Sequence, residues 1–172
     1  MINLLRTRRS VRKFTGQPIE QEKLEILKEA ILRSPTSKNS MACEFIFVDD
    51  QELIQKLSQS KPSGAGALHT AQLAVVVLAK ETETVAWIED SSIASIILQL
   101  TAHALQLGSC WIQIRGREHS EEKNSETFVR ETLNIPDGLR VLSIIAIGYP
   151  QRIQEGKADA ELDFGKIHPN GF

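Results

Sequence analysis

Two patterns of hydrophobic positions occur along the chain. Apolar residues at helical spacing predict helices, and short continuous apolar runs predict strands. In residues 20–33, Leu24, Leu27 and Ile31 recur at helical spacing between charged residues, and Ser34-Pro35 ends the pattern. Short apolar runs elsewhere are typical of buried strands. We expect strands at Phe45–Val48, Ala71–Ala79, Ser109–Gln113 and Val141–Ile147, and further helices at Gln51–Ser58 and from about Ser120–Ser125 to Leu133.

The segment Ser91–Leu107 has almost no polar face, and Gly108 is expected to end it. A helix that is apolar nearly all round is buried on all sides. One chain of 172 residues is too small to surround such a helix. A subunit interface is therefore the natural explanation.

The polar segment 151–172 carries only scattered apolar residues, Phe164, Ile167 and Phe172. Such a tail folds by docking on another surface, and the partner subunit is a candidate. The order of the elements predicts an α+β fold, with a sheet packed by helices in one domain that covers residues 1–172.

The composition is that of a globular protein, with 41% hydrophobic and 24% charged residues. The net charge of -2 gives no general reason to expect nucleic acid or a membrane surface as a partner. Residues 1–6 do not fit a signal peptide, and no apolar run approaches the roughly 18 residues that span a bilayer. Cys43 and Cys110 have neither metal-ligand nor redox spacing. We therefore expect a cytoplasmic protein without a metal site.

Positive charge is concentrated in residues 6–13, which carry five cations and no acid. Guanidinium groups match phosphate oxygens, and Ser10 adds a hydroxyl, so the cluster suits a small anion. Two alternatives are a solvated basic face at a helix end and a nucleic-acid arm. The arm fits poorly, because only Phe14 adds an aromatic residue.

A polar loop, Ser34–Ser40, follows the first predicted helix. Its short hydrogen-bonding side chains suit either the polar edge of a ligand or an ordinary turn. A basic phosphate clamp followed by one helix and then this loop is more specific than either part alone.

The order of these motifs resembles that of the nitroreductase family. The resemblance covers nearly the whole chain, and each motif is weak alone while their order and spacing are specific. It begins with the two segments above and continues through the start and end of the long helix to the last predicted strand. The matching segments are Arg8–Phe14, Pro18-Ile19, Ser34–Ser40, Ala86–Ala94, Leu107–Ile112 and Ile147–Pro150.

The resemblance implies an α+β nitroreductase-like fold, with a central, mostly antiparallel sheet packed by helices in an intertwined homodimer. It also implies two FMN molecules in the interface and ping-pong hydride transfer from NADH or NADPH through FMN to nitro compounds, quinones or similar small acceptors. We expect no catalytic residue, because the flavin carries the chemistry.

The resemblance also assigns site residues. Arg8, Arg9, Ser10 and Arg12 match contacts to the FMN phosphate and ribityl chain. The loop that the other subunit lays against the flavin corresponds to Pro35, Thr36, Ser37 and Asn39. A late basic pair that reaches the phosphate corresponds to Lys166 and His168, where His168 departs from the usual lysine or arginine and is alternatively a surface residue.

Two departures from the family leave the function partly open. The short chain implies missing or reduced helices over the active site, and Gln113–Arg117 replaces a Pro-x-Glu-Gly type segment beside the flavin. Arg115 and Arg117 either face a phosphate of the nicotinamide cofactor or belong to a plain basic turn. The alternatives to an oxidoreductase are a non-catalytic dimeric flavin-binding or sensing module, and a specialised flavin chemistry such as dehalogenation or flavin breakdown.

Overall fold

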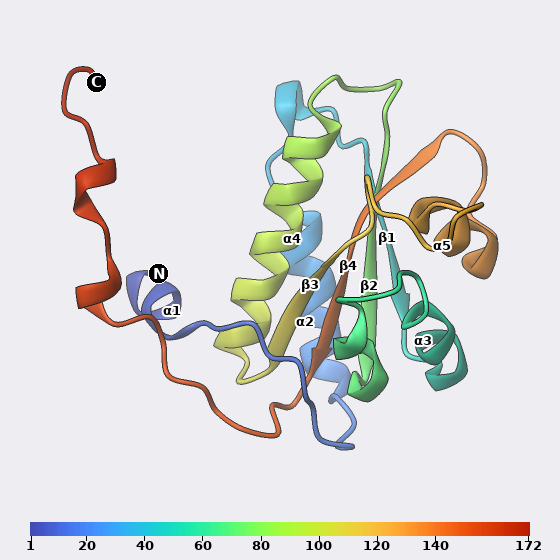
Figure 1. The fold of residues 1–172 in the computed structure, drawn as a ribbon, viewed down its shortest axis with the longest axis horizontal. Helices are drawn as coiled ribbons and strands as arrows, with labels where there is room; N and C mark the ends of the chain where they lie inside the picture. The colour runs from blue at the N-terminus through green and yellow to red at the C-terminus, as the bar shows by residue number, and fades with distance from the viewer.

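A four-stranded antiparallel sheet organises residues 1–172 of the computed structural model. Its strand order is β1-β2-β4-β3, so that β1 and β3 are the edges (Figure 1). All three pairings are antiparallel, which confirms the predicted α+β sheet. The strands are β1 (Cys43–Val48), β2 (Leu73–Lys80), β3 (Gly108–Gln113) and β4 (Leu139–Gly148).

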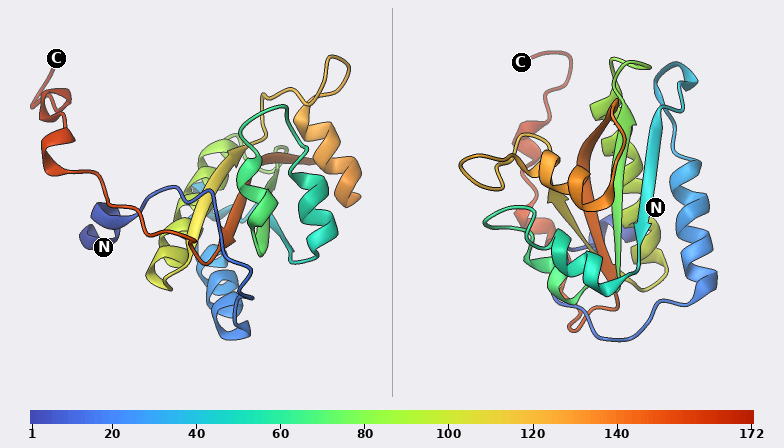
Figure 2. Two further views of the ribbon diagram at one scale, coloured as in Figure 1. Left: turned by 60° about the horizontal axis from the view of Figure 1, so that its bottom comes forward. Right: turned by 90° about the vertical axis from the view of Figure 1, so that its right-hand side faces the viewer.

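Helices cover both faces of this sheet (Figure 2). On one face, α2 (Gln21–Leu32) and α4 (Trp87–Ala104) pack against one apolar cluster. On the other face, α3 (Gln51–Leu57), α5 (Ser125–Leu133) and the short η2 (Gly66–Thr70) pack against a second cluster. The two clusters explain the unbroken apolar run of β2, because alternate residues of this strand point into opposite clusters and all are buried except Lys80.

The long helix differs in two ways from its prediction. It begins at Trp87, and the carboxylates of Glu89 and Asp90 in its first turn complement the helix dipole. It ends at Ala104, because Gln106 adopts a positive φ of 64° and the Leu107 N–H donates to the Ala102 carbonyl. The prediction that Gly108 ends the helix is therefore wrong.

One face of α4 remains exposed in the chain. Ile93 and Ile96 keep 38% and 39% of their surface accessible, whereas Ala94, Leu98 and Ala102 are buried against the sheet. No helix of the structure, α4 included, combines the length and the apolar character that crossing a membrane requires. The exposed face of α4 thus lacks a covering element within this chain.

Both chain ends extend away from the body (Figure 1). The helix α1 (Ile2–Thr7) was not predicted, and its apolar residues Ile2 and Leu5 are more than half exposed. The tail contains only η3 (Asp159–Glu161) and η4 (Phe164–Lys166), and Phe164 is 68% exposed. These apolar side chains are not buried by the body of their own chain.

Candidate functional site

The basic segment after α1 is fixed along the outer edge of β3. Ser10 forms a parallel bridge with Ser109, and the Val11 N–H donates to the Ser109 carbonyl at 2.8 Å. Val11 is buried against Gly108, where an added Cβ would lie 2.7 Å from the Val11 Cβ. The absence of a side chain at Gly108 therefore lets the segment approach the strand.

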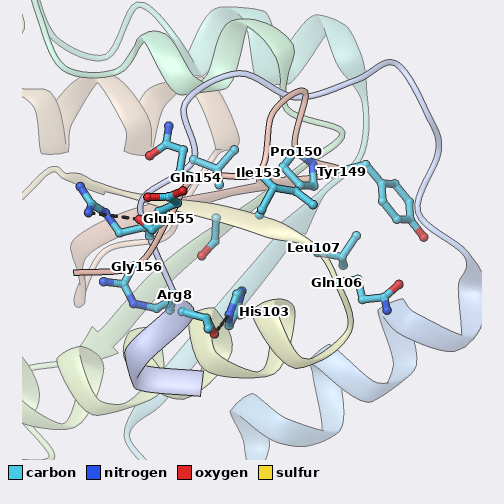
Figure 3. A pocket seen from close by; sticks show the side chains of 15 residues that line it. Arg8, His103, Gln106, Leu107, Tyr149, Pro150, Ile153, Gln154, Glu155 and Gly156 are labelled. Atoms are coloured by element: carbon cyan, nitrogen blue, oxygen red, sulfur yellow. Dashed lines mark hydrogen bonds between the residues drawn. The ribbon is translucent and has the colours of Figure 1, made fainter. Parts of the chain in front are cut away.

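A cavity of about 730 Å³ lies beside this segment, within the size range of ligand pockets. Figure 3 shows Arg8 and His103 on one side of it and residues 153–156 of the tail on the other. The Thr7 hydroxyl lies 2.7 Å from His103 Nε2. Arg9 also lines the cavity and donates to the Glu155 carbonyl at 3.3 Å.

The arginines of this segment have no acidic partner. Arg8, Arg9 and Arg12 take part in none of the ion pairs of the structure. Unpaired guanidinium groups beside a serine are suited to a phosphate. The donor set therefore fits the anion that the sequence predicts.

The surroundings of Cys110, in the middle of β3, show that several cationic side chains lie near this strand. Burial raises the pKa of the Cys110 thiol, and the nearby charges of Arg12, Lys61 and Arg8 oppose the rise. Cations from two distant segments thus lie around one strand. Sequence reasoning missed Lys61, because a single lysine in a loop forms no pattern.

The predicted loop is built at the other end of α4. The Asp90 carboxylate, which is 2% exposed, accepts the Ser37 N–H at 2.8 Å. It also accepts the Ser40 hydroxyl at 3.5 Å. The Thr36 hydroxyl accepts the Met41 N–H at 3.1 Å. Sequence reasoning missed Asp90 as the anchor of this loop.

The loop and the basic segment do not meet within one chain. Asp90 holds the loop near the start of α4, and His103 contacts Thr7 near its end. These two helical residues are thirteen positions apart in a helix that rises about 1.5 Å per residue, which is about 20 Å. A ligand at the arginines therefore needs another source for its second wall.

The late basic pair lies in the tail. Lys166 Nζ is 4.0 Å from an Asp163 carboxylate oxygen, and the His168 ring stacks on Phe172 at 4.0 Å. Neither side chain has a hydrogen bond or ion pair with the basic segment. The predicted phosphate contact of Lys166 and His168 stays a prediction.

The segment after β3 forms a turn at Gly116, which has a φ of 67°. The Arg115 guanidinium lies 5.7 Å from the centroid of the Trp87 ring, and Arg140 lies 5.5 Å from it. Trp87 is thus a core anchor between two cations.

The fold and the site together define a class of α+β proteins in which a segment rich in unpaired arginines lies along the edge of an antiparallel sheet. Comparisons with known proteins identify the family to which this α+β chain belongs. The family model described as the nitroreductase family matches residues 5–63 and 59–149. The chain belongs to the nitroreductase family.

Individual relatives extend this match along the chain. A solved FMN-dependent nitroreductase from Clostridium difficile is 42% identical, covers 100% of both chains and superposes with a TM-score of 0.98. An Archaeoglobus fulgidus protein provisionally named NADH dehydrogenase/NAD(P)H nitroreductase is 30% identical over 97% of this chain and 95% of its own length. Nitroreductase A from Vibrio parahaemolyticus, 23% identical with a TM-score of 0.83, shares the fold, and the match covers 99% of this chain and 75% of that one.

Proposed function

We propose that the chain is an FMN-dependent oxidoreductase that transfers hydride from NADH or NADPH through FMN to nitro compounds, quinones or similar acceptors. The observation that carries the proposal is the row of unpaired arginines fixed on the edge of β3. The names of the relatives, an FMN-dependent nitroreductase and an NAD(P)H nitroreductase, support the cofactor and the donor.

In this proposal the protein binds and orients, and FMN supplies the hydride chemistry. Arg8, Arg9, Ser10 and Arg12 hold the phosphate and the ribityl chain. The outward backbone groups of β3 lie next along the edge and offer hydrogen bonds to the ring. No side chain is required as a general acid, base or nucleophile.

The second wall of the site comes from a second copy of the chain. In a two-fold dimer whose α4 helices run antiparallel, the loop end of one α4 lies beside the arginine end of the other. Pro35, Thr36, Ser37 and Asn39 of each protomer then face the arginines of its partner. The exposed Ile93 and Ile96 of α4 support this arrangement.

The chain ends fit the same dimer. Apolar residues of α1 and the tail, such as Leu5, Phe164 and Ile167, are exposed on segments that leave the body. Docking on the partner would bury them and carry Lys166 and His168 toward a phosphate site. The free thiols Cys43 and Cys110 support the reducing setting of the cytoplasm.

Spectroscopy of the purified protein tests the proposal. We expect a flavin spectrum that bleaches when NADH or NADPH is added without air and recovers when a quinone or nitroarene follows. A bound flavin that stays oxidised would favour the non-catalytic binding module. A colourless protein that takes up no added FMN would refute the proposed cofactor.

A further inference from the structure

The turn after β3 carries two arginines that have no counter-ion. Arg115 and Arg117 flank Gly116, and both side chains are exposed. Neither guanidinium forms an ion pair, although Glu118 follows directly in the chain. Guanidinium groups that no carboxylate neutralises are available to an anionic ligand.

Backbone hydrogen bonds fix this turn at both of its ends. The Arg117 N–H donates to the Ile114 carbonyl at 3.1 Å, and the Arg117 carbonyl accepts the N–H of Ser125, the first residue of α5, at 2.8 Å. Gly116 has a φ of 67°, and an added Cβ there would meet nothing within 4 Å. The turn is therefore anchored between β3 and α5 and has open space at Gly116, between the two arginines.

The surroundings of the two arginines add further positive charge. The Arg115 guanidinium lies 5.7 Å from the centroid of the Trp87 ring, within the range of a cation–π interaction. Arg117 lies close to Lys61, whose Nζ donates to the Gln113 carbonyl at 3.1 Å. Burial, and then the positive charge of Arg117, lowers the pKa of the Lys61 ammonium. Because like charges repel, an anion bound at this turn would lower the electrostatic free energy of the whole group.

The turn lies at the end of β3 opposite the basic segment. The basic segment contacts the strand at Ser109, and the strand ends at Gln113, four residues and about 13 Å further along. In the proposed function the FMN phosphate lies at the basic segment, so FMN leaves the charge of the turn without a phosphate. The other ligand that reaches the flavin ring is the nicotinamide dinucleotide, and its phosphates are the available anions.

We propose that Arg117, with Arg115 beside it, binds the 2′-phosphate of NADPH, so that the enzyme uses NADPH in preference to NADH. The inference rests on the proposed function, which supplies the flavin and the dinucleotide. The two dinucleotides differ only in this phosphate, which carries about two negative charges and three acceptor oxygens. The guanidinium fork matches these oxygens, and its exposure lets the dinucleotide leave after each turnover.

Arg117→Ala tests the inference, because it removes the guanidinium from an exposed position and leaves the backbone of the turn intact. With one quinone as the acceptor and at constant ionic strength, kcat/KM for NADPH should fall about tenfold. The value for NADH should change less than about twofold, because NADH has no 2′-phosphate to lose a contact. Arg117→Lys should give an intermediate value for NADPH, since it keeps the charge and loses the fork.

Lys56→Ala is the matched control, because Lys56 is an exposed cation in α3 without an ion pair. It changes the net charge by the same amount and should leave the ratio of the NADPH and NADH values unchanged. Adenosine 2′,5′-bisphosphate and adenosine 5′-monophosphate give a second readout as inhibitors. Arg117→Ala should weaken inhibition by the bisphosphate about tenfold and leave inhibition by the monophosphate unchanged.

Three results would overturn the inference. An unmodified enzyme that uses NADH as well as NADPH would show that the 2′-phosphate is not recognised. An equal loss with both dinucleotides in Arg117→Ala would assign Arg117 to the shared pyrophosphate instead. Loss of FMN from the purified Arg117→Ala protein would assign Arg117 to the flavin site. Failure of the unmodified protein to bind FMN would refute the proposed function, and thus differs from all three.

Discussion

The Asp90 carboxylate accepts the backbone N–H of Ser37 at 2.8 Å and thereby ties the polar loop to the first turn of α4. Asp90→Ala should leave this N–H without its partner, at a cost of about 1–3 kcal/mol. Because the loop forms one wall of the proposed FMN site, we expect about tenfold weaker FMN binding. A titration of the apoprotein with FMN, followed by flavin fluorescence, measures the change.

Asp90→Asn is the matched control for this prediction. Asparagine keeps a side-chain oxygen that accepts the Ser37 N–H, so the loop and most of the FMN affinity should remain. Urea unfolding of both variants separates loss of the loop from loss of the fold. Wild-type FMN affinity in a folded Asp90→Ala protein would contradict the proposed role of the loop.

Gly108 lets the basic segment, which forms the other wall of the proposed site, lie close to β3. A Cβ there would lie 2.7 Å from the Val11 Cβ, so Gly108→Ala should push the basic segment away from β3. Overpacking of this kind costs about 1–3 kcal/mol of stability, and the FMN phosphate should bind more weakly. Gly16→Ala, where nothing lies within 4 Å of the added Cβ, should change neither quantity. Calorimetry of FMN binding to the two variants distinguishes them.

The sheet was predictable from sequence because its signal is local. The run in β2 is apolar on both faces, and such a run indicates a strand covered by helices on each side. The arginine segment was predictable for a similar reason, since five cations within eight residues form a local cluster.

The anchors of the site were not predictable, because their contacts join distant parts of the sequence. Asp90 contacts a loop 53 residues away, and Lys61 contacts a carbonyl 52 residues away. Lys61 forms no motif with its neighbours, and the segment Ala86–Ala94 around Asp90 does not indicate which loop this carboxylate contacts. The end of α4 was missed for another reason, since Gln106 adopts a left-handed conformation that glycine usually takes.

A hydroxyl links α2 to the end of β4 and gives a pH-dependent contribution to stability. Tyr149 donates to the Glu20 carboxylate at 2.6 Å and accepts from Lys23. The hydrogen bond from Tyr149, then a backbone hydrogen bond to the Glu20 carboxylate and, more weakly, the charge of Lys23 lower the pKa of Glu20 below its ordinary value of 4.5. The folded state therefore favours the carboxylate, and this stabilisation is present above the ordinary pKa and lost as pH falls through the lowered one.

Tyr149→Phe should remove that contribution while keeping the ring under Lys23. We expect a lower melting temperature than that of the unmodified protein at pH 7, and a difference that shrinks as the pH falls below about 4.5. Thermal unfolding at several pH values checks this. Glu20→Gln should show the same convergence, and a difference that persists at low pH would rule out the carboxylate as its origin.

If two protomers share each FMN site, mixing two differently impaired variants should restore some of the sites. If the arginines of one protomer meet the loop of its partner, an Arg8→Ala, Arg12→Ala chain and an Asp90→Ala chain each form impaired dimers. Mixed by co-expression, they form hybrid dimers with one doubly altered site and one intact site. Random pairing makes about half of the dimers hybrid, so about a quarter of all sites should bind FMN with wild-type affinity. Equilibrium dialysis at low FMN counts these sites. No recovery in the mixture would rule out a site built from the arginines of one protomer and the loop of its partner, and Ile96→Asp in both chains should abolish recovery by separating the α4 helices.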